Sequence, residues 1–280
     1  MKKQFPLLCI ALLIFCSINS YAQITPAPSS TQTIMQDFAL GKITLTYSRP
    51  DVKGRKIFGY TEPYGSVWRT GANSATAITF TDDVMMEGHK IPAGEYGLFS
   101  IPGADQWTII LSKNSKQWGA YSYKEADDFL RFTITPIKLP ENIETLTMQF
   151  ANVFPTTSEL HLKWEHTELI IHLKADIDAR VMARIDSAMQ TDKKPYYDAV
   201  IYYYNNNKDM GKALVWANEL EKVPGMPLMV AKLWKARVLL KKGDKAAATA
   251  TAQEGIAAAE KDKSEEYIRM NKEVIADAKK

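Results

Sequence analysis

Three arginines, Arg49, Arg55 and Arg69, lie in one glycine-rich stretch of the sequence, residues 47–76. A guanidinium group carries a planar fork of N–H donors that binds two oxygens of a carboxylate, phosphate or sulfate at once. Glycines let the backbone around such a group turn sharply and approach a ligand closely. We therefore expect the arginines to form an anion-binding surface built on loops.

Side chains suited to a sugar ring accompany the arginines. Aromatic rings can stack on a sugar, and an asparagine amide offers a hydrogen-bond donor and an acceptor. The segment Trp118-Gly119-Ala120-Tyr121 either extends this surface or forms a strand that faces the core, and we favour the surface. We predict an anionic or carbohydrate-like ligand, with no cofactor and no metal ion. The predicted ligand-binding residues are Arg49, Arg55, Tyr64, Trp68, Arg69, Asn73, Trp118 and Tyr121.

A structural role is the alternative for the same stretch. Trp68 could fill the core beneath a long loop, and Arg69 could anchor that loop through an ion pair. An exposed ion pair adds about 0–1 kcal/mol, whereas a buried one is costly to break. The acidic partners within reach in the sequence are Asp51, Glu62 and Asp83.

The sequence shows no catalytic motif, and we predict no catalytic residues. It contains no G-x-S-x-G elbow, no H-E-x-x-H metal motif and no phosphate-binding glycine loop. The carboxylates Asp82-Asp83, Asp127-Asp128 and Glu95 lie beside turns, where acidic residues usually serve the turn. A binding protein is therefore favoured over an enzyme. The alternative is a hydrolase that acts on cell-envelope sugar or peptide.

Residues 37–175 predict an antiparallel β-sandwich or small barrel. Apolar and polar residues alternate in short runs, such as Thr76 to Thr81, and turn residues recur roughly every ten positions. A hairpin with its turn at His166-Thr167 sets Trp164 opposite Leu169. The same register sets His161 opposite His172, but a catalytic zinc site needs three protein ligands and we expect a solvated histidine pair.

Residues 176–280 show helical periodicity and predict about six helices. Lys212-Ala213 and Lys245-Ala246 each open a helix 33 positions apart, close to the period of a tetratricopeptide repeat. A generic helical array is the alternative, because the consensus side chains of that repeat are absent. The expected fold is thus α+β in two segregated domains, a sandwich followed by helical hairpins. The tail either binds a protein or peptide partner or braces the β domain.

Residues 1–22 read as a secretory signal peptide, cleaved after Ala22, with a linker at 23–36. A membrane anchor is the alternative, but the apolar run is shorter than the roughly 20 residues that a spanning helix needs. We therefore expect a periplasmic or secreted protein with no transmembrane span. Removing Lys2 and Lys3 takes the 35 basic residues to 33, against 32 acidic ones, a formal charge of +1 that argues against nucleic-acid binding. Cys9 and Cys16 also lie in the removed segment.

Residues 37–175 resemble a secreted bacterial family known as domain of unknown function 2911. The family has no established activity, so the resemblance implies kinship and leaves the function open. Several members carry a helical tail like this one. The motifs that carry the resemblance are Tyr47-Ser48-Arg49-Pro50, Lys53-Gly54-Arg55, Phe58-Gly59, Pro63-Tyr64-Gly65, Trp68-Arg69-Thr70-Gly71-Ala72-Asn73, Ile91-Pro92-Ala93-Gly94-Glu95-Tyr96, Leu98-Phe99, Trp107-Thr108 and Trp118-Gly119-Ala120-Tyr121.

Overall fold

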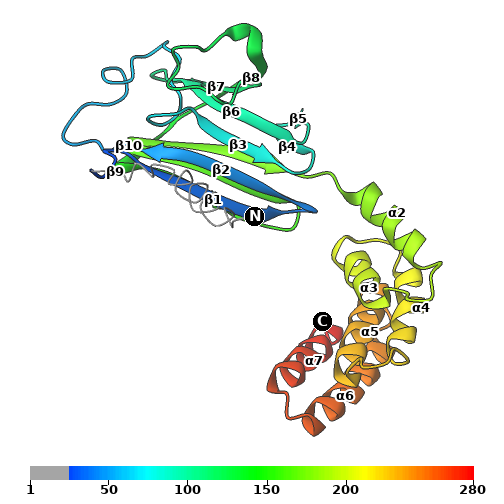
Figure 1. The fold of residues 1–280 in the computed structure, drawn as a ribbon. Coiled ribbons are helices and arrows are strands. Elements are labelled where there is room, and N and C mark those ends of the chain that lie inside the picture. The colour runs from blue at the N-terminus through cyan, green and yellow to red at the C-terminus, as the bar shows by residue number, and fades with distance from the viewer. Residues whose placement is uncertain (1–24) are drawn as a thin grey trace, which may run out of the picture. The chain divides into compact units, whose positions relative to one another are not determined.

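Alternating apolar residues form strands in the first part of the chain, and helical periodicity governs the second (Figure 1). The computed structural model describes residues 25–280, which divide into two units, one ending at Ile177 and the other spanning Asp178–Lys280. The predicted α+β fold, strands followed by helices, is confirmed. The predicted signal peptide, its cleavage site and both cysteines lie outside the described residues.

A six-stranded antiparallel sheet forms one layer of the β unit. Its central strands are apolar on the inward face: Ile78 and Phe80 are buried, whereas Ala77 and Thr79 are half-buried. This is the alternation expected of strands with one face in a core. The strands, in their order across the sheet, are β1 (Ser30–Phe38), β2 (Gly41–Arg49), β3 (Thr76–Phe80), β6 (Gly94–Ile101), β7 (Trp107–Ser112) and β8 (Asp128–Ile134).

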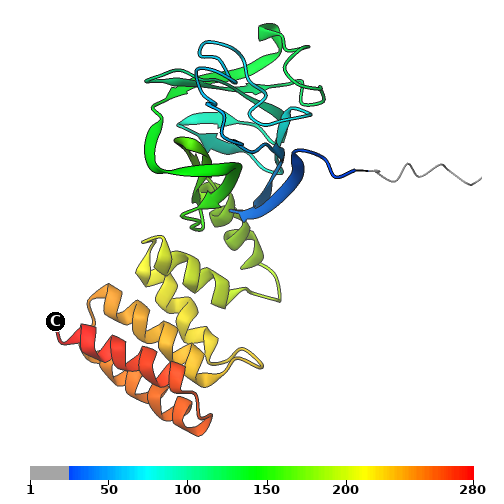
Figure 2. The ribbon, with the colours of Figure 1, turned by 90° about the vertical axis from the view of Figure 1, so that its left-hand side faces the viewer.

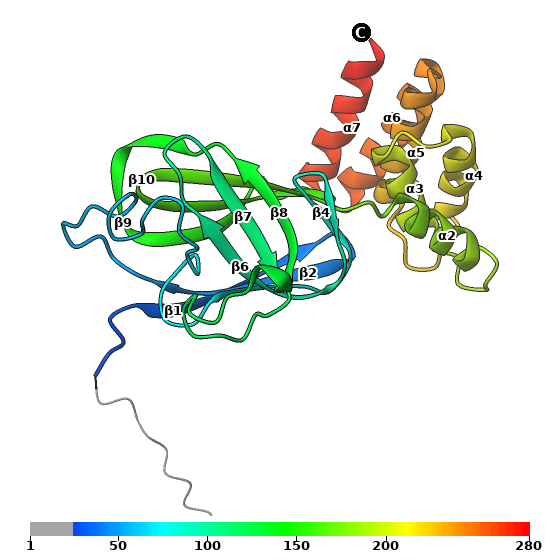
Figure 3. The same ribbon diagram turned by 90° about the horizontal axis from the view of Figure 1, so that it is seen from above.

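A four-stranded antiparallel sheet forms the second layer, which Figure 3 shows from above. Hydrogen bonds join the two layers. In one of them, the Tyr47 hydroxyl of β2 donates to the Met148 carbonyl of the second sheet at 3.2 Å. A one-turn helix, η1 (Glu125–Asp127), precedes β8. The strands of this sheet, in spatial order, are β5 (His89–Ile91), β4 (Val84–Met86), β10 (Thr157–Lys174) and β9 (Ile137–Ala151).

The segment β10 turns back on itself at Glu165, whose φ is +53°. The Ala175 amide donates to the Thr156 carbonyl at 2.8 Å, which brings together the two ends of the segment and places these residues opposite each other. The hairpin therefore exists, but its register is shifted by two residues from the predicted one, which set Trp164 opposite Leu169. A shift of two keeps the same side chains on the buried face, so the apolar pattern alone did not distinguish the registers.

Strand β1 corrects the predicted linker at 23–36. Residues 30–36 pair with β2 in register, from Ser30 opposite Arg49 onward. The strand lies at the edge of its sheet and only Phe38 is fully buried. Its weak apolar pattern hid it from sequence analysis. The β unit also extends to Ile177, two residues past the predicted boundary.

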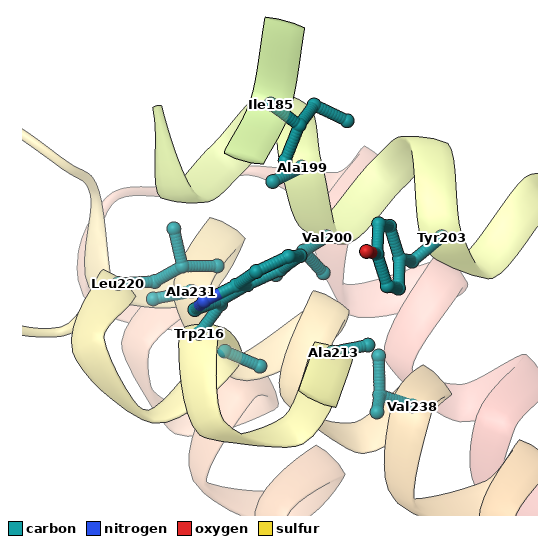
Figure 4. Packing of buried hydrophobic residues seen from close by; sticks show 10 residues of the cluster. Ile185, Ala199, Val200, Tyr203, Ala213, Trp216, Leu220, Ala231 and Val238 are labelled. Carbon is teal, nitrogen blue, oxygen red and sulfur yellow. The ribbon is translucent and has the colours of Figure 1, made fainter. Parts of the chain in front are cut away.

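The helices of the second unit stack side by side in chain order, as Figure 2 shows. Trp216 and Tyr203 meet edge to face, 4.7 Å apart, inside the apolar cluster drawn in Figure 4. Asp209 caps α4 by accepting hydrogen bonds from two backbone amides, and Gly243 ends α5 at φ +97°. None of the helices in residues 25–280 has the length and hydropathy to cross a membrane. The helices are α2 (Asp178–Ala188), α3 (Tyr196–Asn205), α4 (Met210–Leu220), α5 (Leu228–Lys242), α6 (Lys245–Lys261) and α7 (Glu265–Ala278).

Four aromatic rings form the centre of the β core, and two of them belong to the long loop of residues 50–75 that connects β2 and β3. Trp68 is 3% exposed and stacks on Trp164, with ring centres 5.7 Å apart and planes 18° apart. Phe58 meets Trp68, Trp164 and Trp107 edge to face. Such pairs add about 0.5–1.5 kcal/mol each beyond the apolar area they bury. The cluster therefore fixes the loop to both sheets.

Replacing Trp68 with alanine should lower the free energy of unfolding by about 3–5 kcal/mol, because it leaves a cavity in this cluster. Trp68→Phe should lose less, since it keeps a ring in the stack. The matched control is Trp118→Ala at a 64% exposed ring, where the change should stay within about 0.5 kcal/mol. Urea unfolding followed by circular dichroism measures all three. Equal losses at Trp68 and Trp118 would contradict this account of the core.

Candidate functional site

The loop of residues 50–75 runs between β2 and β3 and is held by single bridges instead of its own secondary structure. Asp51 bridges to Thr145, Trp68 to Ser100, and Ser74 to Trp118. These bridges tie the loop to β9, to β6 and to a second loop. Backbone conformations with positive φ let it bend between them, at Lys53, Gly54, Gly59, Gly65, Thr70 and Asn73.

Thr70 is the most constrained of these residues, because a β-branched side chain rarely adopts its φ of +52°. Its side chain is fully buried, with Oγ1 2.9 Å from the Ser100 hydroxyl. The Thr76 hydroxyl donates to its carbonyl at 2.8 Å. Strain of this kind costs on the order of 1–3 kcal/mol and persists only where surrounding contacts enforce it. The loop next to Arg69 is therefore held in one conformation.

A cavity of about 410 Å³ opens beneath this loop and brings together several predicted ligand-binding residues. Arg55, Arg69 and Asn73 line it. Its size falls within the range of roughly 300–1,000 Å³ typical of small-molecule sites. We call it the loop pocket. Its other polar or charged lining residues are Ser29, Asp51, Lys53, Thr61 and Glu62.

Arg69 makes no hydrogen bond or ion pair through its side chain with any residue in 25–280, and its Nε atom is buried without a partner. None of the three acids proposed to anchor Arg69 forms an ion pair with it. Asp51 lies 3.6 Å from Lys53 Nζ, and Asp83 lies 3.1 Å from Lys90 Nζ. Glu62 lies across the loop pocket and acts on Arg69 only through longer-range attraction. The ion pair expected by the structural alternative is therefore not formed.

Arg55 keeps its positive charge available, although it makes two hydrogen bonds. Its Nε donates to the Val52 carbonyl at 3.0 Å, and its Nη2 donates to the Asp51 carbonyl. Carbonyl oxygens orient a guanidinium group without neutralising it. Arg55 and Arg69 therefore present two cations to one pocket.

Glu62 adds a carboxyl group to the lining of the same pocket. Burial raises its pKa from 4.5 to about 7, against the opposing attraction of Arg69 and then Arg55. Its carboxyl group makes no hydrogen bond and no ion pair within the described part of the chain. Desolvation without a bonded partner explains why the neutral form is favoured.

Arg49 does not reach the loop pocket, which corrects its predicted role. Its Nε donates to the Leu146 carbonyl and its Nη2 to the Thr147 hydroxyl, both at 3.0 Å. Successive strand residues face opposite sides, so Arg49 points away from the side on which its neighbour Pro50 lines the pocket. Arg49 joins the two sheets.

Two aromatic residues also lie outside the loop pocket. The rings that surround Trp68 cover it, so it serves the core, as the structural alternative proposed. Tyr64 is 49% exposed and lies over Gly59, where a Cβ atom would come within 2.8 Å of its ring. Neither residue is among those that line the cavity.

The segment from Trp118 to Tyr121, which the sequence assigned to the ligand-binding surface, lies beside Arg69 but is not among the residues that line the loop pocket. A Cβ atom at Gly119 would lie 3.1 Å from Arg69 Nη1 and 2.7 Å from the Tyr121 ring, so this turn packs beside the arginine. Trp118 lines a second cavity of about 480 Å³, and Asn73 lines both cavities. Trp118 and Tyr121 are 64% and 85% exposed. Two exposed rings therefore belong to the segment whose turn packs beside Arg69.

Asn73 is largely committed to holding the backbone. Its Nδ2 donates to the Ser29 carbonyl at 3.1 Å and to the Ser48 hydroxyl at 3.3 Å. Its own carbonyl accepts from the Gly119 amide at 2.9 Å. Asn73 therefore fixes the wall between the two cavities.

Sequence reasoning missed Glu62 as a pocket residue and considered it only as a partner of Arg69. Asp51 was treated in the same way, and Lys53 was not considered for the ligand site. The one available signal was position, because all three fall between the arginines of the loop. Their convergence depends on the bends of the backbone, which the residue types alone do not specify.

The sequence predicted His161 opposite His172, but these two histidines of β10 do not face each other. The His161 ring lies 2.7 Å from Glu168 and 2.8 Å from Glu159, whereas the His172 ring lies 2.8 Å from Glu87. The shifted register separates them. Among residues 25–280 no group of three or more His, Cys, Asp and Glu side chains is arranged to hold a metal ion.

Comparison with protein families matches residues 29–173 to the family described as "Protein of unknown function (DUF2911)". The chain belongs to this family. The resemblance inferred from the loop motifs is confirmed, and the match begins upstream of β1, which the sequence had assigned to a linker. Searches among curated proteins and among solved structures found no match. The DUF2911 description names no activity, and the helical unit lies outside the matched residues.

Glu62 should make the stability of the β unit depend on pH. The unfolded chain releases the Glu62 proton near 4.5 and the folded chain near 7, so the folded state holds more protons between these values. Its stabilising contribution is complete below pH 4.5 and is lost as the pH rises through 7. Glu62→Gln should therefore match the wild type at pH 4 and exceed its free energy of unfolding by about 1–3 kcal/mol at pH 8.

Urea unfolding at both pH values measures this difference. The matched control is Glu141→Gln, at an exposed position of β9 outside the pocket, which should show no such gain. A Glu62→Gln variant that is less stable than the wild type at pH 8 would show that the carboxylate is needed by the fold.

Proposed function

We propose that this DUF2911 protein binds a small anionic ligand in the loop pocket. The observation that carries the proposal is the convergence of Arg55 and Arg69, the second of which has a buried Nε donor without a protein partner. Hydrogen bonds between ionised groups are about twice as strong as neutral ones, and a guanidinium fork binds two oxygens of one anion. A carboxylate, phosphate or sulfate group satisfies both arginines.

The second cavity extends the proposal to the rest of the ligand. Trp118 lines this cavity, and the Tyr121 ring packs at the Gly119 turn beside Arg69; both rings are exposed, so a sugar ring or another flat group can stack on them. Among carbohydrates, an acidic sugar is the kind that combines both features. Its anionic group would bind the arginines, and its ring would lie toward Trp118.

We also propose that the protein is exported and that its helical unit has a separate role. The short apolar run of residues 7–15 after two lysines supports a signal peptide. The stacked helices of the tail support a tetratricopeptide-like array that binds a protein partner or braces the β unit.

The hydrolase alternative has one observation in its favour. Glu62 carries a carboxyl group with a pKa of about 7 inside the pocket, a value suited to general acid-base catalysis. Recovering the bound probe unchanged after prolonged incubation supports binding, whereas its cleavage supports the hydrolase.

Arg69→Ala should weaken anion binding at least tenfold, because a hydrogen bond to a charged group contributes about 1.5–3 kcal/mol. Isothermal titration calorimetry with phosphate, sulfate and glucuronate measures the affinities. Stability should change by less than about 1 kcal/mol, since Arg69 has no bonded partner to lose. The control Arg269→Ala removes an equally charged, 71% exposed side chain on α7 and should leave binding unchanged.

Two results would count against this site. If the wild type binds none of these anions, or if Arg69→Ala binds them equally well, the pocket is not an anion site. A large loss of stability in Arg69→Ala would instead favour the structural role of this arginine.

The mature protein recovered from the exporting cell should begin at Gln23, because the small residues at 20 and 22 suit signal peptidase cleavage after Ala22. Mass spectrometry of the intact protein measures the N-terminus. A chain that keeps Met1 and remains in the cytoplasm would refute export.

A further inference from the structure

The loop pocket contains charges of both signs, which a site for a plain anion does not need. Lys53, Arg55 and Arg69 contribute cations, and Asp51 and Glu62 contribute acids. The five side chains line one cavity of about 410 Å³. Whatever binds there meets a carboxyl group as well as the guanidinium groups.

The two acids differ in what they bind within the protein. Asp51 accepts a hydrogen bond from the Thr145 hydroxyl at 2.9 Å and lies 3.6 Å from Lys53 Nζ. Glu62 has neither a hydrogen bond nor an ion pair through its side chain to any described residue. Asp51 therefore belongs to the loop scaffold, whereas Glu62 is left to interact with a ligand.

We propose that the ligand is a zwitterion of amino acid or short peptide type, whose carboxylate binds Arg55 and Arg69 and whose ammonium group binds Glu62. This inference rests on the anion site proposed above. An ammonium group supplies the positive partner that Glu62 lacks and satisfies its oxygens with up to three donors. The cavity volume suits a molecule of this size.

Selectivity is the physical reason to place an acid among arginines. An ionised Glu62 repels a ligand that carries only negative charge, and this cost discriminates against simple anions. A glutamine or a further cation in place of Glu62 would serve a plain anion better. Glu62 instead favours binding of a ligand that carries a positive group at a fixed distance from its own carboxylate.

Other charged groups near the pocket are occupied. The Glu144 carboxylate accepts from the Lys53 amide at 2.8 Å, and the Glu165 carboxylate accepts from the Ile57 amide at 3.2 Å. The groups that face Glu62 across the cavity are thus Asp51, Lys53, Arg55 and Arg69. Burial raises the pKa of Glu62 to about 7, so its charge changes near neutral pH.

The test compares alanyl-alanine with N-acetyl-alanyl-alanine, which keeps the carboxylate and lacks the ammonium group. Calorimetry at pH 7.5, where most Glu62 is ionised and the peptide amine is still largely protonated, should give at least tenfold tighter binding of the free dipeptide. Lowering the pH to 5.5 should weaken the free dipeptide and strengthen the acetylated one, because Glu62 becomes neutral. The two probes should therefore respond to pH in opposite directions.

Glu62→Gln should remove both the preference and the opposite pH responses, whereas the control Glu141→Gln should keep them. A preference for the acetylated dipeptide at pH 7.5, or a preference for the free dipeptide that survives in Glu62→Gln, would overturn the inference. Failure to bind either dipeptide would also overturn it. The anion site would still stand if phosphate, sulfate or glucuronate binds and depends on Arg69, and it would fall only if these probes fail too.

Discussion

The stacking of Trp68 on Trp164 is the interaction on which the loop and its pocket depend. A 26-residue connection, residues 50–75, with no helix or strand of its own would lose too much conformational entropy to stay in one place without an anchor. Trp68 supplies that anchor through its buried ring, through two backbone hydrogen bonds with Ser100, and through an indole bond to the Gly71 carbonyl. The chain on either side can then remain irregular and still be ordered.

The anchor also determines where the chemistry lies. Neighbouring side chains of an extended segment point in opposite directions. Because Trp68 points into the core, Arg69 points toward the pocket and the turn at Gly119. The strained backbone of Thr70 then bends the chain, so that Asn73 reaches the wall shared by the two cavities. The core residue and the binding residue are therefore adjacent in sequence but opposite in role.

Periodicity made the fold predictable but not the site. Alternation revealed the strands and the hairpin of β10, and helical spacing revealed the tail, because both reflect which side is buried. The register failed by two residues at Glu165, where a left-handed backbone set the turn. Residue type predicted the same anion-binding role for Arg49, Arg55 and Arg69, but only Arg55 and Arg69 line the loop pocket. Arg49 points to the other side of the chain and donates to the Leu146 carbonyl of the opposite sheet. Both facts depend on the folded chain and cannot be read from the residue type.

Three features in the pocket or next to its lining residues each reduce stability. Thr70 adopts a strained conformation, Arg69 buries an Nε donor without a partner, and Glu62 is desolvated enough to raise its pKa to about 7. A chain selected only for stability would replace each at little structural cost, whereas functional sites commonly retain such conflicts. Their concentration around one cavity, while the rings beneath it pack without conflict, is the physical argument that this loop is kept for binding. A loop kept only to close the sandwich would need the anchor at Trp68 but not an unpaired arginine facing an unpaired acid.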